Sequence, residues 1–194
     1  MSDLFYEAIQ QPNAILVDAP IQRIEPEGVR TADGALHELD VLVLATGFRV
    51  DRFIRPTKVL GRGGRDLDDA WSQSPTAYIS MTVPDFPNLF LVNGPNSPFG
   101  NFSAFETAEH QIADIQQRLI AGLQNGDYRE VSPTKAALDA FEAERRKAGE
   151  KTVWVTGCNS WYLDKEGVPA SWTFSFDRFV QETETPRMAD YETR

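Results

Sequence analysis

The segment Asp40-Val41-Leu42-Val43-Leu44-Ala45-Thr46-Gly47-Phe48 is the stretch that decides the fold. Its apolar run from Val41 to Ala45 predicts a short buried strand. The run stops at Thr46-Gly47, where a small residue followed by glycine lets the backbone turn sharply and approach a bound group closely. We therefore expect a buried strand that leads directly into a tight turn.

The residues before this segment predict a small antiparallel unit. Asn13–Asp18 and Ile21–Ile24 have the pattern of strands, and Asp3–Gln10 that of a short helix. Asp33-Gly34 lies between two further strand-like segments and is a strong hairpin signal, because both central residues of such a turn need a positive φ. The combination indicates an α/β domain, with α+β as the alternative.

The middle of the chain alternates irregular segments with short strands. Arg49–Ser74 is rich in Gly, Arg and Asp, and its cluster Gly61-Arg62-Gly63-Gly64-Arg65 follows no strand and opens no helix. That context does not fit a dinucleotide-binding turn, so we interpret the cluster as a mobile surface loop. Tyr78–Val83 and Leu89–Asn93 are predicted strands, and Gly94-Pro95-Asn96 ends the second one.

Helices dominate the second half of the chain. The clearest one has an apolar stripe at helical spacing and ends at Asn125-Gly126. A second helix is expected from Ser132 as N-cap to about Ala148, with a solvated charged face at residues 142–147. Phe174–Glu182 predicts a final amphipathic helix, followed by a frayed tail after Pro186. The stripe of the first helix comprises Phe105, Ala108, Ile112, Ile115, Leu119 and Leu123.

Composition excludes several classes of function. The chain has 194 residues and a formal net charge of -10, which argues against a nucleic-acid partner. It has no apolar run long enough to span a membrane and no signal peptide at its start, so a cytoplasmic location is expected. With 1 Cys (Cys158) and 2 His (His37 and His110, both expected at the surface), a disulfide, a metal site and a nucleophilic cysteine are not expected.

Three blocks of the sequence, in order, resemble class B flavoprotein monooxygenases, the family of Baeyer–Villiger and flavin-containing monooxygenases. The first is the Ala45-Thr46-Gly47 segment. The second runs from Pro87-Asn88-Leu89-Phe90 through Gly94-Pro95-Asn96-Ser97-Pro98 to Asn101-Phe102. The third is Gly157-Cys158-Asn159-Ser160-Trp161-Tyr162, followed by Gly167-Val168-Pro169 and Trp172.

The resemblance implies a cofactor role for particular residues but names no catalytic side chain in this sequence. The helix start near Asn101 and Phe102 would face the flavin, and the Trp161 indole N–H would reach the nicotinamide cofactor. Without the resemblance, a common strand–turn–helix connection and a packed core tryptophan would be the simpler interpretations. The expected cofactor-binding residues are Thr46, Gly47, Gly94, Asn101, Phe102 and Trp161.

The family's chemistry is implied in the same way. Its members use NADPH to reduce FAD, and the C4a-peroxyflavin formed with O2 transfers one oxygen atom to a ketone or to a soft nucleophile such as a sulfide or amine. The Trp161 block favours the Baeyer–Villiger branch, and the substrate itself is not indicated by the sequence.

The sequence lacks the Gly-x-Gly-x-x-Gly fingerprint that holds a dinucleotide pyrophosphate. We therefore expect a C-terminal fragment of such an enzyme, which alone is inactive and holds FAD and NADPH weakly. Residues 1–39 would end the NADP-domain-like part, residues 40–185 would continue the FAD-binding domain, and residues 186–194 would be the tail. The alternative is a non-catalytic truncated module that forms a homo-oligomer or pairs with a complementary N-terminal chain.

Overall fold

The computed structural model describes residues 4–47, 49, 52–98, 102–157, 162–184 and 187–194. The chain divides into two compact units, an N-terminal unit (Met1–Phe48) and a main unit (Arg49–Arg194). Each unit is described by itself.

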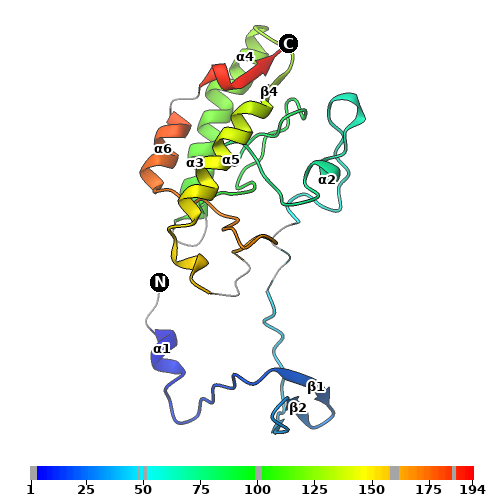
Figure 1. Cartoon of the computed structure of the whole chain (residues 1–194), viewed down its shortest axis with the longest axis vertical. Helices are drawn as coiled ribbons and strands as arrows, with labels where there is room; N and C mark the ends of the chain where they lie inside the picture. Colours follow the sequence, from blue (N-terminus) through cyan, green and yellow to red (C-terminus); the bar gives the residue numbers. More distant parts are fainter. Residues whose placement is uncertain (1–3, 48, 50–51, 99–101, 158–161, 185–186) are drawn as a thin grey trace. The chain divides into compact units, whose positions relative to one another are not determined.

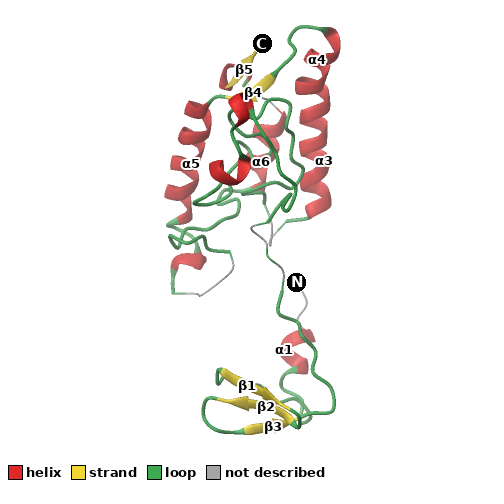
Figure 2. Ribbon diagram, turned by 90° about the vertical axis from the view of Figure 1, so that its right-hand side faces the viewer, coloured by secondary structure: helices red, strands yellow, loops and turns green. Residues whose placement is uncertain are grey.

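The N-terminal unit contains a short helix and a three-stranded antiparallel sheet (Figures 1 and 2). Its elements are α1 (Leu4–Ala8), β1 (Ile21–Glu25), β2 (Gly28–Thr31) and β3 (Leu36–Glu38). The predicted hairpin is confirmed, since β2 pairs with β3 in antiparallel register. Of the two turn residues, however, only Gly34 has a positive φ, at 87°. Asp33 instead braces the turn, and the hydrogen bond it accepts from the Thr31 hydroxyl lowers the pKa of its carboxyl.

The strands predicted at Asn13–Asp18 and Val41–Ala45 are wrong for this structure. Both segments lack strand structure, and Val41 and Leu44 are 76% and 72% exposed. The sheet has the order β1-β2-β3, and none of its strands pairs with either segment. An extended apolar segment is stable as a strand only beside neighbours that satisfy its N–H and C=O groups. Here the described residues provide no such neighbour.

The main unit contains the long helices and a second, two-stranded sheet (Figure 2). β4 pairs antiparallel with β5, at the end of the chain. The mixed helix-and-sheet class is thus confirmed, and all strand pairs of the described residues are antiparallel. The elements are η1 (Arg62–Gly64), α2 (Leu67–Ala70), α3 (Ala104–Asp114), the π-helical η2 (Ile115–Ile120), α4 (Ala121–Asn125), β4 (Val131–Pro133), α5 (Lys135–Gly149), η3 (Val153–Val155), α6 (Phe176–Glu184), η4 (Met188–Asp190) and β5 (Tyr191–Thr193).

Aromatic rings from distant parts of the chain form much of the main core, which also includes residues of η2, α5 and α6. Phe141 of α5 packs against Tyr78 and Trp172, and Trp172 contacts Phe179 of α6 edge-on at 5.2 Å. A smaller cluster around Trp71 and Phe86 fills the irregular region before Leu91. No helix of the described residues has the length and apolar content needed to cross a bilayer.

The predicted strands at Tyr78–Val83 and Leu89–Asn93 are reduced to isolated bridges. Thr82 bridges to both Tyr78 and Phe90, and Leu91 N donates to the Met81 carbonyl at 2.8 Å. Between Tyr78 and Thr82, Ile79 and Ser80 adopt φ of 46° and 61°. This left-handed backbone folds the segment into a tight turn and interrupts the first predicted strand.

The long helix has its predicted span but not its predicted buried face. Ile115 and Leu119 are buried as expected, whereas Phe105 is 85% exposed and Ile112 is 41% exposed. The first part of α3 buries Thr107, Gln111 and Asp114 instead. The reason is that α3 packs there against a loop with polar backbone groups, and a polar helix face satisfies those groups.

Two predictions about the end of the main unit are wrong. α5 begins after Thr134, whose hydroxyl caps Ala137 N at 3.1 Å, while Ser132 belongs to β4. The tail is not frayed, because β5 pairs with β4 and the Tyr78 hydroxyl donates to the Asp190 carboxylate at 2.5 Å. Pairing with a distant strand compensated for the weak local propensity of the tail.

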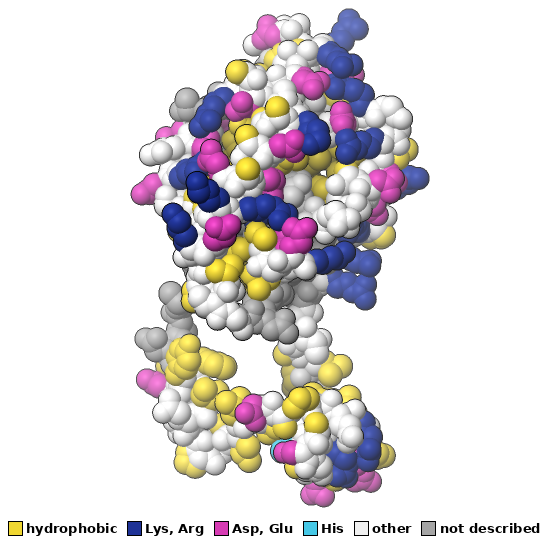
Figure 3. Space-filling model, viewed as in Figure 1, with side chains coloured by type: hydrophobic (Ala, Val, Ile, Leu, Met, Phe, Trp, Pro, Cys, Tyr) yellow, Lys and Arg dark blue, Asp and Glu magenta, His cyan; other side chains and the backbone are white. Residues whose placement is uncertain are grey.

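The Gly61–Arg65 cluster is an anchored turn, which contradicts the expected mobile loop. Arg62 N donates to the Asp85 carbonyl at 2.7 Å, and the Arg62 guanidinium pairs with Glu130 at 3.0 Å and Glu192 at 2.9 Å. A Cβ on Gly61 would lie 2.3 Å from the Asp85 oxygen, so the backbone approach requires glycine. Acidic and basic side chains are intermixed over this unit in Figure 3, as expected for such ion pairs.

The contact between Tyr78 and Asp190 predicts a loss of stability at high pH. Burial, followed by the hydrogen bond to Asp190, raises the pKa of Tyr78, and burial raises that of Tyr191. The folded chain thus holds these protons more tightly than the unfolded chain, whose tyrosines titrate near pH 10. Their contribution to stability is complete below about pH 10 and is lost as pH rises further.

We expect Tyr78→Phe to lower the free energy of unfolding by about 1.5–3 kcal/mol at pH 7, the usual effect of losing a hydrogen bond to a charged group. Urea unfolding of wild type and Tyr78→Phe at pH 7 measures this difference. Urea unfolding of the wild type between pH 8 and 11 measures the loss at high pH, and absorbance at 295 nm follows tyrosine ionisation. Wild-type stability that stays constant from pH 8 to 11 would contradict the assignment.

Candidate functional site

A loop at residues 93–98 forms the centre of the candidate site. Asn93 and Asn96 have φ of 52° and 66°, a left-handed conformation that asparagine tolerates better than most residues. Gly94 packs so closely that a Cβ there would lie 2.4 Å from the Ser80 carbonyl oxygen. Glycine at this position is therefore a steric requirement, and residues 94–98 are buried.

Gln111 attaches this loop to α3. Its side chain is fully buried, accepts a hydrogen bond from Asn93 N at 2.7 Å and donates one to Ser97 Oγ at 3.4 Å. The side-chain Nδ2 of Asn93 in turn donates to the carbonyl of Ala104, the first residue of α3, at 3.2 Å. The polar helix face thus replaces the backbone partners that a strand would have supplied.

The start of α3 has two backbone N–H groups that lack an acceptor among the described residues. Ser103 caps the helix by accepting from Glu106 N at 3.4 Å, and the preceding Phe102 stacks on Phe176 of α6 at 4.9 Å. Among the described residues, Ala104 N and Phe105 N have no acceptor. Such N–H groups, at the positive end of a helix dipole, favour an electron-rich ligand.

The loop is also attached to residues 170–172 on its other side. Trp172 N donates to the Ser97 carbonyl at 3.2 Å, and the Asn96 amide makes a long contact of 3.4 Å with the Ala170 carbonyl. Several buried oxygens around the loop lack a partner among the described residues, and they leave hydrogen-bonding capacity for water or a ligand. They are Ser80 Oγ, Asn96 Oδ1, Thr107 Oγ1 and Ser171 Oγ.

The predicted hairpin around Asp164–Gly167 is confirmed as a tight turn. The Asp164 carboxylate accepts from Glu166 N and Val168 N, both at 2.9 Å, and Gly167 has a φ of 78°. Leu163 bridges to Pro169 across the turn. Trp154 of η3 stacks on Tyr162, which precedes the turn, with the ring centroids 5.2 Å apart.

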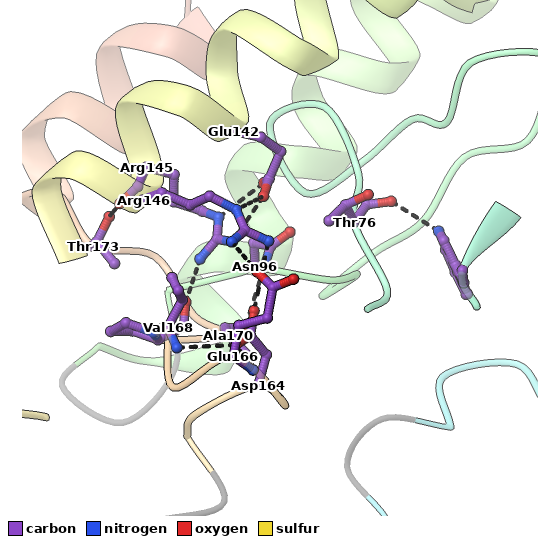
Figure 4. A network of polar contacts seen from close by, with 12 residues as sticks. Thr76, Asn96, Glu142, Arg145, Arg146, Asp164, Glu166, Val168, Ala170 and Thr173 are labelled. Carbon is purple, nitrogen blue, oxygen red and sulfur yellow. Dashed lines mark hydrogen bonds and ion pairs between the residues drawn. The ribbon is translucent and has the colours of Figure 1, made fainter. Parts of the chain in front are cut away.

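Arg145 of α5 donates through Nη1 to the Pro169 carbonyl, just after this turn (Figure 4). It is 1% exposed, which contradicts the expected solvated face, while its neighbour Arg146 is partly exposed and pairs with Glu166 at 2.6 Å. The helical spacing contained the missing signal, because Phe141, Arg145 and Gly149 follow one another at four-residue steps and all three are buried.

The structure brings together only some of the predicted site residues. Gly94 and Phe102 both lie in the main unit, where Gly94 packs against Ser80 and Phe102 stacks on Phe176. Their segments are joined by the hydrogen bond from the Asn93 side chain to the Ala104 carbonyl. Thr46 and Gly47 belong to the N-terminal unit and are exposed, with φ of 80° at Gly47 as the predicted turn requires. Asn101, Trp161 and Cys158 lie outside the described residues.

The histidines are more buried than expected. His37 is half-buried beside the Thr31 hydroxyl at 3.3 Å, and His110 meets the rings of Phe176 and Phe179 edge-on. No group of His, Cys, Asp and Glu suited to a metal ion occurs in the part of the chain that the structure describes.

Relatives and solved structures identify the class of protein. An uncharacterized monooxygenase of Mycobacterium tuberculosis is 45% identical over 175 residues, which are 90% of this chain and 35% of the relative. FAD-binding monooxygenase ktnD of Aspergillus niger is 36% identical over 196 residues, covering 98% of this chain and 32% of the relative. No family model matches the chain.

The solved structures agree. The closed crystal structure of cyclohexanone monooxygenase superposes with a TM-score of 0.80 at 30% identity, over 98% of this chain and 37% of that one. The crystal structure of OTEMO with FAD and NADP gives a TM-score of 0.79 at 26% identity, over 100% of this chain and 37% of that one.

The chain is therefore homologous to part of the flavin monooxygenases. Within that class it corresponds to Baeyer–Villiger and other FAD-binding monooxygenases such as cyclohexanone monooxygenase, which confirms the resemblance seen in the sequence. The chain spans about a third of the length of these relatives.

Gln111 provides the sharpest test of how the loop is built. Gln111→Met keeps the side-chain volume but leaves Asn93 N without its acceptor, so we expect a loss of about 1–3 kcal/mol in unfolding free energy. Gln117→Met, at an exposed position of the same helical run, is the matched control and should change stability by less than about 0.5 kcal/mol. Urea unfolding measures both variants, and equal effects would refute the role given to Gln111.

Proposed function

We propose that this chain forms part of an FAD- and NADPH-dependent monooxygenase that inserts one oxygen atom from O2 into a ketone or a soft heteroatom. The observation that carries the proposal is the buried loop at residues 93–98 beside the N-terminus of α3. When bound, the reduced flavin supplies the electrons that activate O2. The chain's own residues hold and orient the cofactors.

The helix start fits the electron-rich edge of a flavin. The N–H groups of Ala104 and Phe105 have no acceptor among the described residues, and the helix dipole adds positive potential there. Gly94 allows the backbone to lie close to neighbouring groups. We assign the flavin side of the site to Gly94, Asn101 and Phe102, and the nicotinamide side to Trp161.

The same fit does not extend to the phosphates of a dinucleotide. The sequence has no Gly-x-Gly-x-x-Gly, and its glycine cluster at Gly61–Arg65 is occupied by contacts with Asp85, Glu130 and Glu192. We therefore propose that residues 1–39 end an NADP-domain-like part and that residues 40–185 belong to the C-terminal part of an FAD-binding domain. FAD and NADPH would then need a nucleotide cradle that this sequence does not contain.

The relatives favour ketones as the substrate class. Solved relatives include cyclohexanone monooxygenase, which has been crystallised with cyclohexanone and with epsilon-caprolactone, and a steroid monooxygenase bound to NADP. By homology we propose ketone oxygenation, with sulfide or amine oxygenation as the alternative, for the enzyme of which this chain is a part.

A titration of the purified chain with FAD tests the proposed division of labour. We expect a dissociation constant weaker than about 1 μM, because a flavin edge without a phosphate cradle provides few of the contacts of a full site. Quenching of flavin fluorescence and calorimetry measure the affinity. Binding tighter than this would contradict the proposal that the cradle lies outside this sequence.

A non-catalytic interaction module is the second candidate, and exposed apolar segments favour it. Ile15 and Leu16 are 86% and 76% exposed, and Val43 is 79% exposed. Surfaces of this kind mark association sites. Light scattering over a dilution series distinguishes the candidates when read with the titration. A stable homodimer that also binds no FAD at millimolar concentration would favour the module.

A further inference from the structure

The segment at residues 168–173 is held against α5 by contacts that centre on Arg145 (Figure 4). The Arg145 guanidinium donates through Nη1 to the Pro169 carbonyl, and the Arg145 carbonyl accepts from the Thr173 hydroxyl at 2.8 Å. Gly149 at the end of α5 packs so closely that a Cβ there would lie 3.1 Å from Pro169 Cδ. The segment is therefore packed against α5 through Pro169 and Thr173, which lie against Arg145 and Gly149 of the helix.

Arg145 has no freedom to take another position. Its side chain is 1% exposed, and its Nε and Nη2 both donate to the Glu142 carboxylate at 2.8 Å. This planar two-bond pairing fixes the orientation of the guanidinium and leaves Nη1 directed at Pro169. Removal of either partner would leave a buried charge without compensation.

The opposite side of the same segment is bonded to the loop at residues 93–98. Trp172 N donates to the Ser97 carbonyl at 3.2 Å, and the Asn96 amide lies 3.4 Å from the Ala170 carbonyl. Neither Asn96 nor Ser97 is bonded to Arg145 itself. We therefore expect a change at Arg145 to reach the loop through residues 169–172, which are bonded to both.

We propose that Arg145 is a positioning residue that fixes the flavin-side loop relative to the nicotinamide-side block, with residues 169–172 as the bridge. This inference rests on the proposed function, which assigns Gly94 to the flavin side and Trp161, in the same sequence block as Trp172, to the nicotinamide side. The two cofactors must lie at a set distance for hydride transfer. A buried arginine that makes two hydrogen bonds to one carboxylate is suited to hold the two segments at that distance.

Amide hydrogen exchange of the full chain tests the coupling without any cofactor. In Arg145→Met, we expect the amides of Trp172 and Ser97 to exchange about tenfold faster or more, while the β4–β5 pairing keeps its protection. Arg146→Met is the neighbouring control. Arg146 pairs closely with exposed Glu166 at 2.6 Å and only at 3.8 Å and 4.0 Å with Asp164 and Glu142, so its loss should accelerate both amides by less than Arg145→Met does. A merely local role for Arg145 would accelerate Trp172 and leave Ser97 unchanged.

A conservative series keeps the test valid if Arg145→Met fails to fold. Arg145→Lys retains the charge but loses the planar pairing, and Glu142→Gln weakens it while keeping Arg145. Both should accelerate Trp172 and Ser97 together, by less than Arg145→Met does. Acceleration of Ser97 in step with Trp172 supports the proposal. Unchanged Ser97 exchange in all variants, or equal acceleration in Arg146→Met, overturns it, and neither result depends on whether the chain binds FAD.

Discussion

The hydrogen bond from Asn93 N to the buried side chain of Gln111 is the interaction on which the main unit depends. The loop that begins at Asn93 turns through left-handed backbone and is buried, so its N–H and C=O groups need partners other than a neighbouring strand. Gln111 supplies one such partner, and Trp172 N, which donates to the Ser97 carbonyl, supplies another. This requirement explains why α3 presents Gln111 to the interior.

Local signals in the sequence predicted the helices and turns correctly, but they did not predict which residues pack against them. The Asp33-Gly34 hairpin, the helical span ending at Asn125-Gly126 and the helix after Phe174 all follow from short-range propensity and spacing, and each is present. Gly94 was recognised as a turn, and the structure adds that a side chain there would clash with Ser80. Such features depend on residues close to one another in the chain.

The errors came from partners distant in sequence. Val41–Ala45 has the composition of a buried strand, but a strand needs neighbours, and the described residues supply none. Arg145 looked like part of a solvated face because its partner at Pro169 lies beyond the end of its helix. The tail is ordered because β4, far earlier in the chain, pairs with it. Local patterns do not encode these distant partners, although the four-residue spacing of Phe141, Arg145 and Gly149 indicates the buried face of α5.

Homology to part of the Baeyer–Villiger monooxygenases gives this architecture a context. At the start of α3, Ala104 accepts a hydrogen bond from Asn93 of the buried, glycine-dependent loop, and the segment bearing Trp172 is bonded both to that loop and, through Pro169, to Arg145. In the proposed enzyme the chain provides preorganised surfaces, and the nucleotide phosphates are bound by other residues.

The central claim is that α3, the loop at residues 93–98 and the segment at residues 169–172 behave as one hydrogen-bonded unit. A double-mutant cycle on Gln111→Met and Arg145→Met, read by urea unfolding, tests this most directly, because the two side chains share no hydrogen bond. We predict a coupling energy of about 0.5 kcal/mol or more between them. The same cycle with Arg62→Met in place of Arg145→Met should be additive. Additive effects for Gln111 and Arg145 would contradict the account.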